Sequence, residues 1–364
     1  TRTLSGTPAK TETLVGAQNC NIGRLANQPD STRMDGLLDE VRISDVARSQ
    51  GWLATEYNNQ SSSSTFYDIG EGGANGAFDV SGVIYTNEAK TANVGSGVTV
   101  ALSVNGGAKT TTVTAAGGTF SFSDVVADPN DTLLIFIDDH VLHDANLVTQ
   151  CLAEGNHVTG LEMYTNKTVI RSETANPVSN AVLATADGSG DNDIRYSVTG
   201  SGPYDVTFNN SDEVWIAGLK TYKPQGGVTC HDLDVNGTLA MDANSLTVSG
   251  TMEMTGGSFT TSGATTFTST AGETITANGS AFAAVVFTGS GGSWELQDAF
   301  TVTGALTVTA GTLDVNGQTL SVGGAFSNTG TLSLDGNESV TLTMDTDSGT
   351  VRYAGSATYT GLPA

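Results

Sequence analysis

Two acidic segments of this chain carry residue types that can bind a divalent cation. The first, 187–193, reads Asp-Gly-Ser-Gly-Asp-Asn-Asp and places Asp187, Asp191 and Asp193 on a flexible turn. Carboxylate oxygens are the ligands that Ca²⁺ prefers, but the segment lacks the spacing and the distant bidentate Glu of an EF-hand loop. We therefore interpret it as a solvated acidic loop, with a calcium site as the alternative.

The second acidic segment combines carboxylates with two histidines at His-x-x-His spacing, a set that can ligate a divalent metal. Its candidate ligands are Asp138, Asp139, His140, His143 and Asp144. The segment directly follows an apolar run, so a wet loop leaving a strand is the favoured interpretation. The sequence thus assigns no metal site.

Catalytic chemistry has little support in the sequence. His157 and His231 stand alone beside strand patterns, and no Ser-His-Asp order can be singled out. Paired carboxylates on a repetitive face can imitate a polysaccharide-degrading enzyme, but residues 225–364 contain one basic residue, Arg352, against twelve acidic ones. We expect no catalytic and no cofactor-binding residues, and the protein is predicted not to be an enzyme.

Aromatic residues with exposed rings can stack on sugars. The candidates are Trp52, Trp215, Trp294, Tyr164, Tyr196 and Tyr204. Their scatter along the chain favours positions in cores or at the ends of elements. The triplets that begin at Asn166 and Asn236 match the N-glycosylation pattern, which arises by chance in a chain with 54 threonines, and we assign them no role.

Three cysteines, Cys20, Cys151 and Cys230, are too few for a disulfide scaffold and have no Cys-x-x-Cys spacing. Pairing of Cys151 with Cys230 is a hypothesis, because these two residues bracket the irregular block that precedes the repeats. The chain opens on Thr1-Arg2-Thr3 without a leader pattern, which predicts a matured or excised piece.

Charge and composition limit the partners and the fold class. Fourteen Lys and Arg against 38 Asp and Glu give a net charge of −24, which disfavours nucleic acid and anionic membrane surfaces. No apolar run approaches the length of a membrane span, so membrane insertion is not expected. With 45 glycines and 54 threonines the chain favours turns and β-strands, and an all-β fold is predicted.

The C-terminal part, 225–364, repeats a short strand pattern between glycine-containing turns. Apolar pairs such as Leu306-x-Val308, Leu313-x-Val315 and Leu320-x-Val322 follow one another closely. An earlier set of such pairs matches this pattern when Leu233 is aligned with Leu306, which indicates an internal repeat. Three strands of this length per coil predict a parallel, right-handed β-solenoid with stacked inward side chains and outward Thr rows.

Four segments are predicted in total. Residues 1–73 combine short strands with a helix at 49–58, 74–140 form a β-sandwich with one buried face on each sheet, and 141–224 are an irregular β block holding the first coils. The solenoid repeats, 225–364, are the fourth segment. Asn105-Gly106-Gly107 and Ala116-Gly117-Gly118 serve as hairpin turns in the sandwich.

Three of these segments resemble modules of large bacterial surface proteins. Met34–Ser44, Trp52 and Thr55–Gln60 resemble the C-terminal end of a laminin-G-like, concanavalin-type jelly roll whose earlier strands this chain lacks. Val80–Val83 and Gly118–Phe122 are similar to immunoglobulin-like or prealbumin-like modules. The repeats resemble the solenoid stalks of secreted adhesins and filament proteins, which implies an extracellular scaffold.

Three functions follow as hypotheses. The first is a structural subunit of an extracellular filament, sheath or stalk, because an incomplete N-terminal module and an uncapped solenoid end favour head-to-tail pairing of copies into an open fibre. The alternative is an adhesin that holds a surface polysaccharide on a rigid spacer. The third is a degradative β-helix enzyme.

Overall fold

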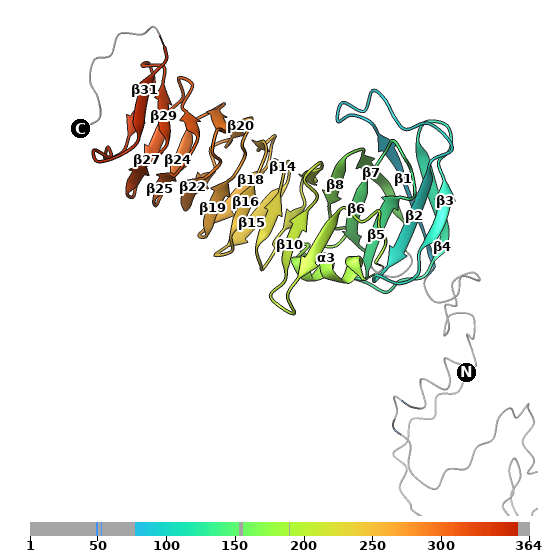
Figure 1. Ribbon diagram of the computed structural model, residues 1–364. Helices are drawn as coiled ribbons and strands as arrows, with labels where there is room; N and C mark the ends of the chain where they lie inside the picture. Colours follow the sequence, from blue (N-terminus) through green and yellow to red (C-terminus); the bar gives the residue numbers. More distant parts are fainter. Residues whose placement is uncertain (1–48, 50–51, 53–76, 153–155, 189, 356–364) are drawn as a thin grey trace, which may run out of the picture. The chain divides into compact units, whose positions relative to one another are not determined.

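The structure, a computed structural model, describes Ser49, Trp52 and residues 77–152, 156–188 and 190–355 (Figure 1). The chain divides into two compact units, Thr1–Ile69 and Gly70–Ala364. The predicted jelly-roll segment 1–73 and its helix lie outside the described residues except at two positions. There, Trp52 is helical and its amide donates to Ser49 Oγ at 3.2 Å.

In the second unit, the described residues form strands β1 to β31 and the helix α3 (Asn180–Asp187), which build a short sandwich that continues into a β-solenoid (Figure 1). A thirteen-stranded sheet, the long sheet, runs through both parts in the order β3 (Thr110–Val113), β2 (Thr99–Val104), β5 (Thr132–Ile137), β6 (Asn146–Gln150), β8 (Lys167–Ile170), β11 (Glu213–Ile216), β14 (Asp232–Val235), β17 (Met252–Glu253), β20 (Gly272–Thr276), β23 (Ser293–Leu296), β26 (Thr312–Asp314), β29 (Thr331–Leu334) and β31 (Thr350–Tyr353). The β1 sheet faces it in the sandwich and contains β4 (Thr119–Val125), β1 (Phe78–Tyr85) and β7 (Val158–Tyr164).

Two further faces complete the solenoid. The eight-stranded sheet contains β9 (Tyr196–Thr199), β10 (Asp205–Phe208), β13 (Val228–Cys230), β16 (Leu246–Val248), β19 (Ala264–Phe267), β22 (Ala284–Phe287), β25 (Leu306–Val308) and β28 (Phe326–Asn328). The third face consists of β12 (Thr221–Tyr222), β15 (Thr238–Asp242) and β18 (Ser258–Thr261), then β21 (Ala281–Phe282), β24 (Phe300–Val302), β27 (Leu320–Val322) and β30 (Val340–Thr341). The predicted parallel β-solenoid is confirmed.

Alternating burial along each short strand builds the solenoid core. In the eight-stranded sheet Val285 pairs with Leu306, which pairs with Phe326, and all three side chains are buried. Residues that alternate with these buried positions along each strand point outward. On β13, β16 and β19 the outward residues Thr229, Thr247 and Thr266 align in a row. An uncharged outer row avoids the repulsion that stacked carboxylates would create along the axis, which explains the abundance of Thr.

The internal repeat is real, but its unit is shorter than the interval from Leu233 to Leu306. Leu246 pairs with Thr265 in the next coil, so one coil takes about 20 residues, as in other solenoid repeats. Leu233 lies in the long sheet, whereas Leu306 lies in the eight-stranded sheet. The strands of all three faces have the same pattern of alternating apolar residues. Apolar pairs therefore still align when the sequence is shifted against itself by an interval that is not a whole number of coils.

The long sheet is buried on both faces where sandwich and solenoid meet. In β5, Leu133 and Ile135 pack into the sandwich core, whereas Leu134 and Phe136 pack into the solenoid core. The prediction of one buried face per sheet is therefore wrong for this sheet. Two cores on opposite sides require the continuous apolar run of β5, a pattern typical of doubly covered strands.

The two predicted glycine turns of the sandwich behave differently. Asn105 and Gly106 have φ of 51° and 66° and join β2 to β3, which pair antiparallel as expected. The Ala116–Gly118 turn instead carries the chain from β3 in the long sheet to β4 in the β1 sheet. It is therefore a connection between sheets and not the hairpin that the sequence predicted.

Both ends of the eight-stranded sheet are closed by the chain itself. Helix α3, which no pattern in the sequence predicted, packs on the first coils, and the Asp187 carboxylate accepts a hydrogen bond from the Val198 amide at the outer strand β9. At the other end the Asn328 amide donates to Asp345 Oδ2 at 2.7 Å, and Ser348 Oγ donates to the Asn328 carbonyl at 3.0 Å. This end of the eight-stranded sheet therefore has a polar cap. The strand for which the sequence predicted an end without a polar cap, Val351-Arg352-Tyr353, lies in the long sheet instead.

Carboxylates also join neighbouring coils. Asp298 accepts the backbone amides of Ala277 at 2.7 Å and Asn278 at 2.5 Å, where Asn278 has a φ of 46°. We predict that Asp298→Ala lowers the free energy of unfolding by about 1–2 kcal/mol, because two turn amides lose their acceptor. Urea unfolding at neutral pH measures the loss, and Asp298→Asn, which keeps an acceptor oxygen, should lose less. Equal losses in the two variants would contradict this role.

Candidate functional site

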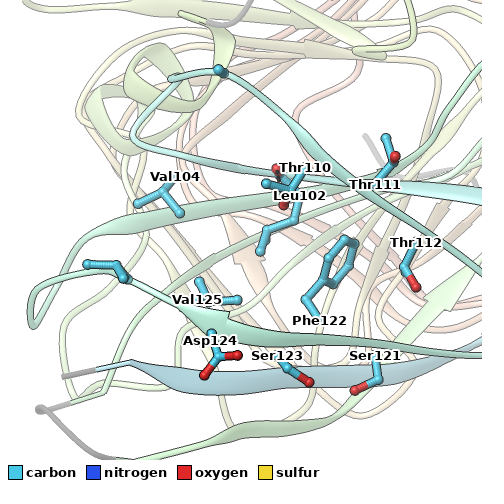
Figure 2. Close-up of a pocket in the computed structure, with 12 residues that line it drawn as sticks. Leu102, Val104, Thr110, Thr111, Thr112, Ser121, Phe122, Ser123, Asp124 and Val125 are labelled. Atoms are coloured by element: carbon cyan, nitrogen blue, oxygen red, sulfur yellow. Dashed lines mark hydrogen bonds between the residues drawn. The ribbon is translucent and has the colours of Figure 1, made fainter. Parts of the chain in front are cut away.

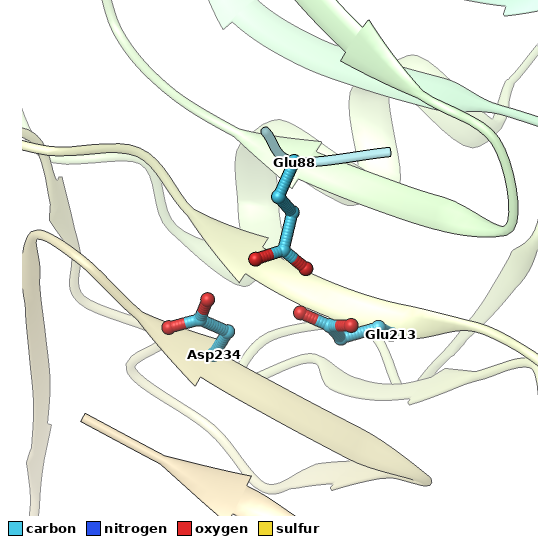
Figure 3. A group of neighbouring side chains, drawn as sticks. All are labelled: Glu88, Glu213 and Asp234. Carbon is cyan, nitrogen blue, oxygen red and sulfur yellow. The ribbon is translucent and has the colours of Figure 1, made fainter. Parts of the chain in front are cut away.

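Three carboxylates converge on the outer face of the long sheet where it passes from sandwich to solenoid. Glu213 lies on β11, Asp234 on the adjacent β14, and Glu88 on the loop that follows β1 (Figure 3). One oxygen from each lies within 4.8 Å of the others. Parallel register brings the strand residues together, because Glu213 pairs with Asp232 and Trp215 with Asp234.

The Lys167 ammonium neutralises part of this carboxylate cluster. Lys167 pairs in register with Glu213, and its Nζ lies 2.6 Å from Glu88 Oε1 and also contacts the Glu213 carboxylate. The same ammonium lies 5.2 Å from the centre of the Trp215 ring, a favourable cation–π position. Lys167 is only 8% exposed, so its ammonium is shielded from water, whereas its partner Glu88 is exposed.

Burial shifts the protonation of Glu213 and Asp234 towards the neutral acids. It raises the pKa of Glu213 to about 7, because desolvation together with repulsion from Glu88 and Asp234 outweighs the attraction of Lys167. Burial also raises the pKa of Asp234, although Thr255 Oγ1 donates to its Oδ1 at 2.6 Å. The cluster therefore offers a proton donor near neutral pH, and its oxygens suit Ca²⁺ or Mg²⁺ only where a cation displaces Lys167.

Sequence reasoning missed this cluster because Glu88 is far from its partners along the chain. The proximity of Glu213 and Asp234 could have been predicted from the sequence, because the regular coil length aligns Glu213 with Asp232 and Trp215 with Asp234. Glu88 is placed by the pairing of β1 with β7, which no local pattern in the sequence indicates.

The raised pKa of Glu213 predicts a pH-dependent stability. Ionising a group whose folded-state pKa is raised costs stability, so the free energy of unfolding falls as the pH rises from about 4.5 to about 7. We expect Glu213→Gln to remove this slope, which amounts to at most about 3 kcal/mol. Urea unfolding between pH 4.5 and 8 measures it, with the exposed Glu253→Gln as control; parallel profiles for wild type and Glu213→Gln would refute the assignment.

A groove of about 220 Å³ adjoins the cluster and has an aromatic wall. The rings of Tyr164 and Trp215 stack with centroids 4.2 Å apart, and Tyr85 lies 5.8 Å from Tyr164. Charges of both signs surround it, from Glu88, Lys90, Glu162 and Arg171. The structure thus joins two of the six candidate aromatic residues in one polar and aromatic groove.

The other candidate aromatic residues do not form a platform with this pair. Trp294 is fully buried in the solenoid core against Phe287, and Tyr196 is buried with its hydroxyl donating to the Leu183 carbonyl at 3.3 Å. Tyr204 is half-buried in the segment before β10. Trp52 belongs to the other unit of the chain.

The two predicted acidic segments form one network. The Asp139 amide donates to Asp193 Oδ2 at 2.8 Å, and Lys109 Nζ bridges Asp138 Oδ1 at 2.5 Å and Asp191 Oδ2 at 2.6 Å. Asp138, Asp139 and Asp193 offer oxygens within 4.8 Å of one another. An internal ammonium therefore supplies the positive charge here, and Asp187, the first member of the predicted loop, accepts from β9 instead.

The histidines do not complete a metal site in the described part of the chain. His140 and His143 stack with centroids 5.0 Å apart, and His140 Nδ1 accepts the His143 amide at 3.1 Å. Asp144 instead forms an ion pair with Arg195, in which Asp144 Oδ2 lies 3.4 Å from Arg195 Nη1. His157 is exposed and accepts the Asp79 amide at 2.9 Å, and His231 hydrogen-bonds Ser249 Oγ at 3.1 Å, so both have surface or structural positions as expected.

The hypothesis of a Cys151–Cys230 disulfide is wrong. Both thiols are free and buried, Cys151 in the sandwich core and Cys230 in the solenoid core. Two cores on opposite sides of the long sheet keep the thiols apart. Burial raises the pKa of Cys151 to about 12 and that of Cys230 further, which makes both poor nucleophiles.

Paired carboxylates do occur on the solenoid face. Glu295 on β23 pairs in register with Asp314 on β26, and burial raises the pKa of Asp314. Glu295 Oε1 accepts the side-chain amides of Gln297 at 2.9 Å and Asn316 at 3.0 Å. These neutral donors satisfy the glutamate within its own coil and the next one, an arrangement that stabilises stacking of the coils.

A second groove, of about 370 Å³, lies between the outer strands β3 and β4 (Figure 2). Leu102, Phe122 and Val125 give it an apolar floor, and Thr and Ser side chains line its rim. Within the described residues β3 ends the long sheet and β4 ends the β1 sheet, so two strand edges flank the groove. Such edges are templates for pairing with another strand.

Comparison with known proteins gives no relative: no family model, no curated protein and no solved structure matches this chain.

Proposed function

We propose that this protein is a non-enzymatic structural subunit of an extracellular filament, sheath or stalk, in which copies join head to tail through their strand edges. The observation that carries the proposal is the long sheet, which continues from the sandwich through the solenoid and, within the described residues, has β3 and β31 as its outer strands. One hydrogen-bonded sheet that spans both parts suits an element under mechanical tension, and its two different outer strands suit a heterologous, open assembly.

Charge and composition support an extracellular scaffold over other roles. The net charge of −24 disfavours nucleic acid as a partner. The outward row of Thr247 and Thr266 is uncharged, and residues 225–364 contain one basic residue, Arg352, so these coils offer little positive charge to an anionic ligand. In the described part of the chain no helix has the length and apolar composition needed to span a bilayer. The resemblance of the repeats to adhesin stalks also favours the bacterial cell surface.

Electron microscopy and light scattering of the purified chain test this proposal. We expect fibres or linear oligomers whose length grows with protein concentration. A monodisperse monomer at all concentrations and salt levels would overturn it.

The groove beside Trp215 favours a second candidate, an adhesin that binds a surface polysaccharide. An aromatic wall with polar groups of both signs is the composition of many ligand sites. A glycan array with and without Ca²⁺ should then show saturable binding that Trp215→Ala abolishes and that Trp52→Ala, in the other unit, leaves unchanged. Binding unaffected by Trp215→Ala would exclude this groove.

A further inference from the structure

The ends of the solenoid sheets differ in how their strand edges are protected. In the eight-stranded sheet, Asp187 takes the outer amide of Val198 and Asp345 takes that of Asn328. Carboxylates in these places block the approach of a further strand. In the long sheet, among the described residues, no carboxylate takes the outward amides of β3, nor that of Val351 on β31. At each end of the eight-stranded sheet a carboxylate thus occupies one outward amide, whereas among the described residues no carboxylate occupies the outward amides of Thr111, Val113 and Val351 in the long sheet.

Hydrogen-bond register identifies the outward amides. The Thr114 amide donates to the Val98 carbonyl at 2.9 Å, and successive residues of an antiparallel strand alternate sides, so Thr112 and Thr110 also face β2. Thr111 and Val113 therefore point their amides away from the sheet. On β31 the Thr350 amide donates to Gly330 at 2.9 Å, towards β29, so the Val351 amide points outward.

The flanking groove fits the end of the solenoid in composition and charge. Its apolar floor of Leu102, Phe122 and Val125 matches the apolar residues at the last coil, among them Val340 and Val351, which pack partly exposed against the solenoid core. Asp124 on the groove rim and Arg352 on β31 are both exposed and have opposite charges. Because each chain carries a net charge of −24, most contacts between copies are repulsive. An attractive contact between Asp124 and Arg352 therefore favours pairing of β3 with β31 over other contacts.

We infer that the assembly contact joins β31 of one copy to β3 of the next, so that the long sheet continues from subunit to subunit and the end of the solenoid core covers the groove between β3 and β4. This inference rests on the proposed self-assembly and specifies its contact. In this assembly the eight-stranded sheet takes no part in pairing, because at each of its ends a carboxylate already occupies one outward amide, that of Val198 or that of Asn328.

Proline at an outward position tests the contact, because it removes an amide that the subunit's own sheet does not use. Thr111→Pro disables β3 and Val351→Pro disables β31, whereas Thr111→Ala and Val351→Ala keep the amides and serve as matched controls. We expect each proline variant alone to raise the dissociation constant for association at least about tenfold, with an unchanged circular dichroism spectrum. Analytical ultracentrifugation measures the association.

Mixing the two proline variants gives the decisive result. Each retains one intact end, so an equimolar mixture should form heterodimers and nothing longer. A mixture that stays monomeric, or proline variants that assemble like wild type, would overturn this contact while wild-type fibres still support self-assembly. A wild-type chain that never assembles would instead refute the proposed function. If a proline variant loses its fold, Val113→Lys, which places a charge on the β3 edge, replaces Thr111→Pro with the same expected outcomes.

Discussion

Replacing Lys167 with Gln is expected to lower the free energy of unfolding by about 3–5 kcal/mol at pH 8. Lys167 is 8% exposed, and its ammonium lies among Glu88, Glu213 and Asp234, whose oxygens are within 4.8 Å of one another. Without it, like charges face each other in a partly desolvated place. Urea unfolding followed by circular dichroism measures the loss.

The loss in Lys167→Gln should shrink as the pH falls below about 6. Burial already raises the pKa values of Glu213 and Asp234, and removal of the ammonium raises them further, so protons replace the missing charge. Lys90→Gln is the matched control, because its pair with Glu162 is exposed at 44% and 40% and should contribute less than about 1 kcal/mol. A loss that does not depend on pH would show that packing of the Lys167 stem dominates.

Phe287→Ala is expected to cost about 3–5 kcal/mol of stability. The Phe287 ring is fully buried between Phe267 at 5.0 Å and Trp294 at 4.9 Å, so its removal leaves a cavity that the stacked coils cannot close by moving together. In a solenoid each coil contacts its neighbours only, so the damage should stay local. Hydrogen exchange should show lost protection in the adjacent strands β19, β22 and β25, with β2 and β5 unchanged.

The preceding residue gives the control for Phe287→Ala. Val286 lies in the outward row of the same strand between Thr266 and Thr307, and its truncation to Ala should change stability by less than about 1 kcal/mol. Similar losses for Val286→Ala and Phe287→Ala would contradict the assignment of inner and outer rows.

The acidity of the chain has a structural use that composition alone does not indicate. Asp205 accepts the Gly227 amide at 2.7 Å, Asp232 the Thr251 amide at 2.7 Å, and Asp298 and Asp345 bind amides of adjacent coils in the same way. Each carboxylate satisfies a backbone donor at a turn or an edge that the sheets leave unpaired. Several of the acidic residues in 225–364 therefore connect one coil to the next through hydrogen bonds.

Local sequence patterns were enough to predict the fold class and the solenoid. Alternating apolar pairs between glycine turns predict short strands with one inward face, and strands this short can bury that face only against copies above and below. These features are local and periodic, so the order of residues along the chain contains them. For β5 the sequence predicted a strand with one buried face, and the structure shows that both of its faces are buried.

Which distant residues meet depends on the three-dimensional arrangement of the strands. The pairing of β1 with β7 brings Glu88 to Glu213, and the two acidic segments close on Lys109. The long sheet places Cys151 and Cys230 in separate cores, and α3 with Asp187 closes an end of the eight-stranded sheet. Such contacts depend on sheet order and register, which long-range hydrogen bonds set and which a short stretch of sequence does not encode.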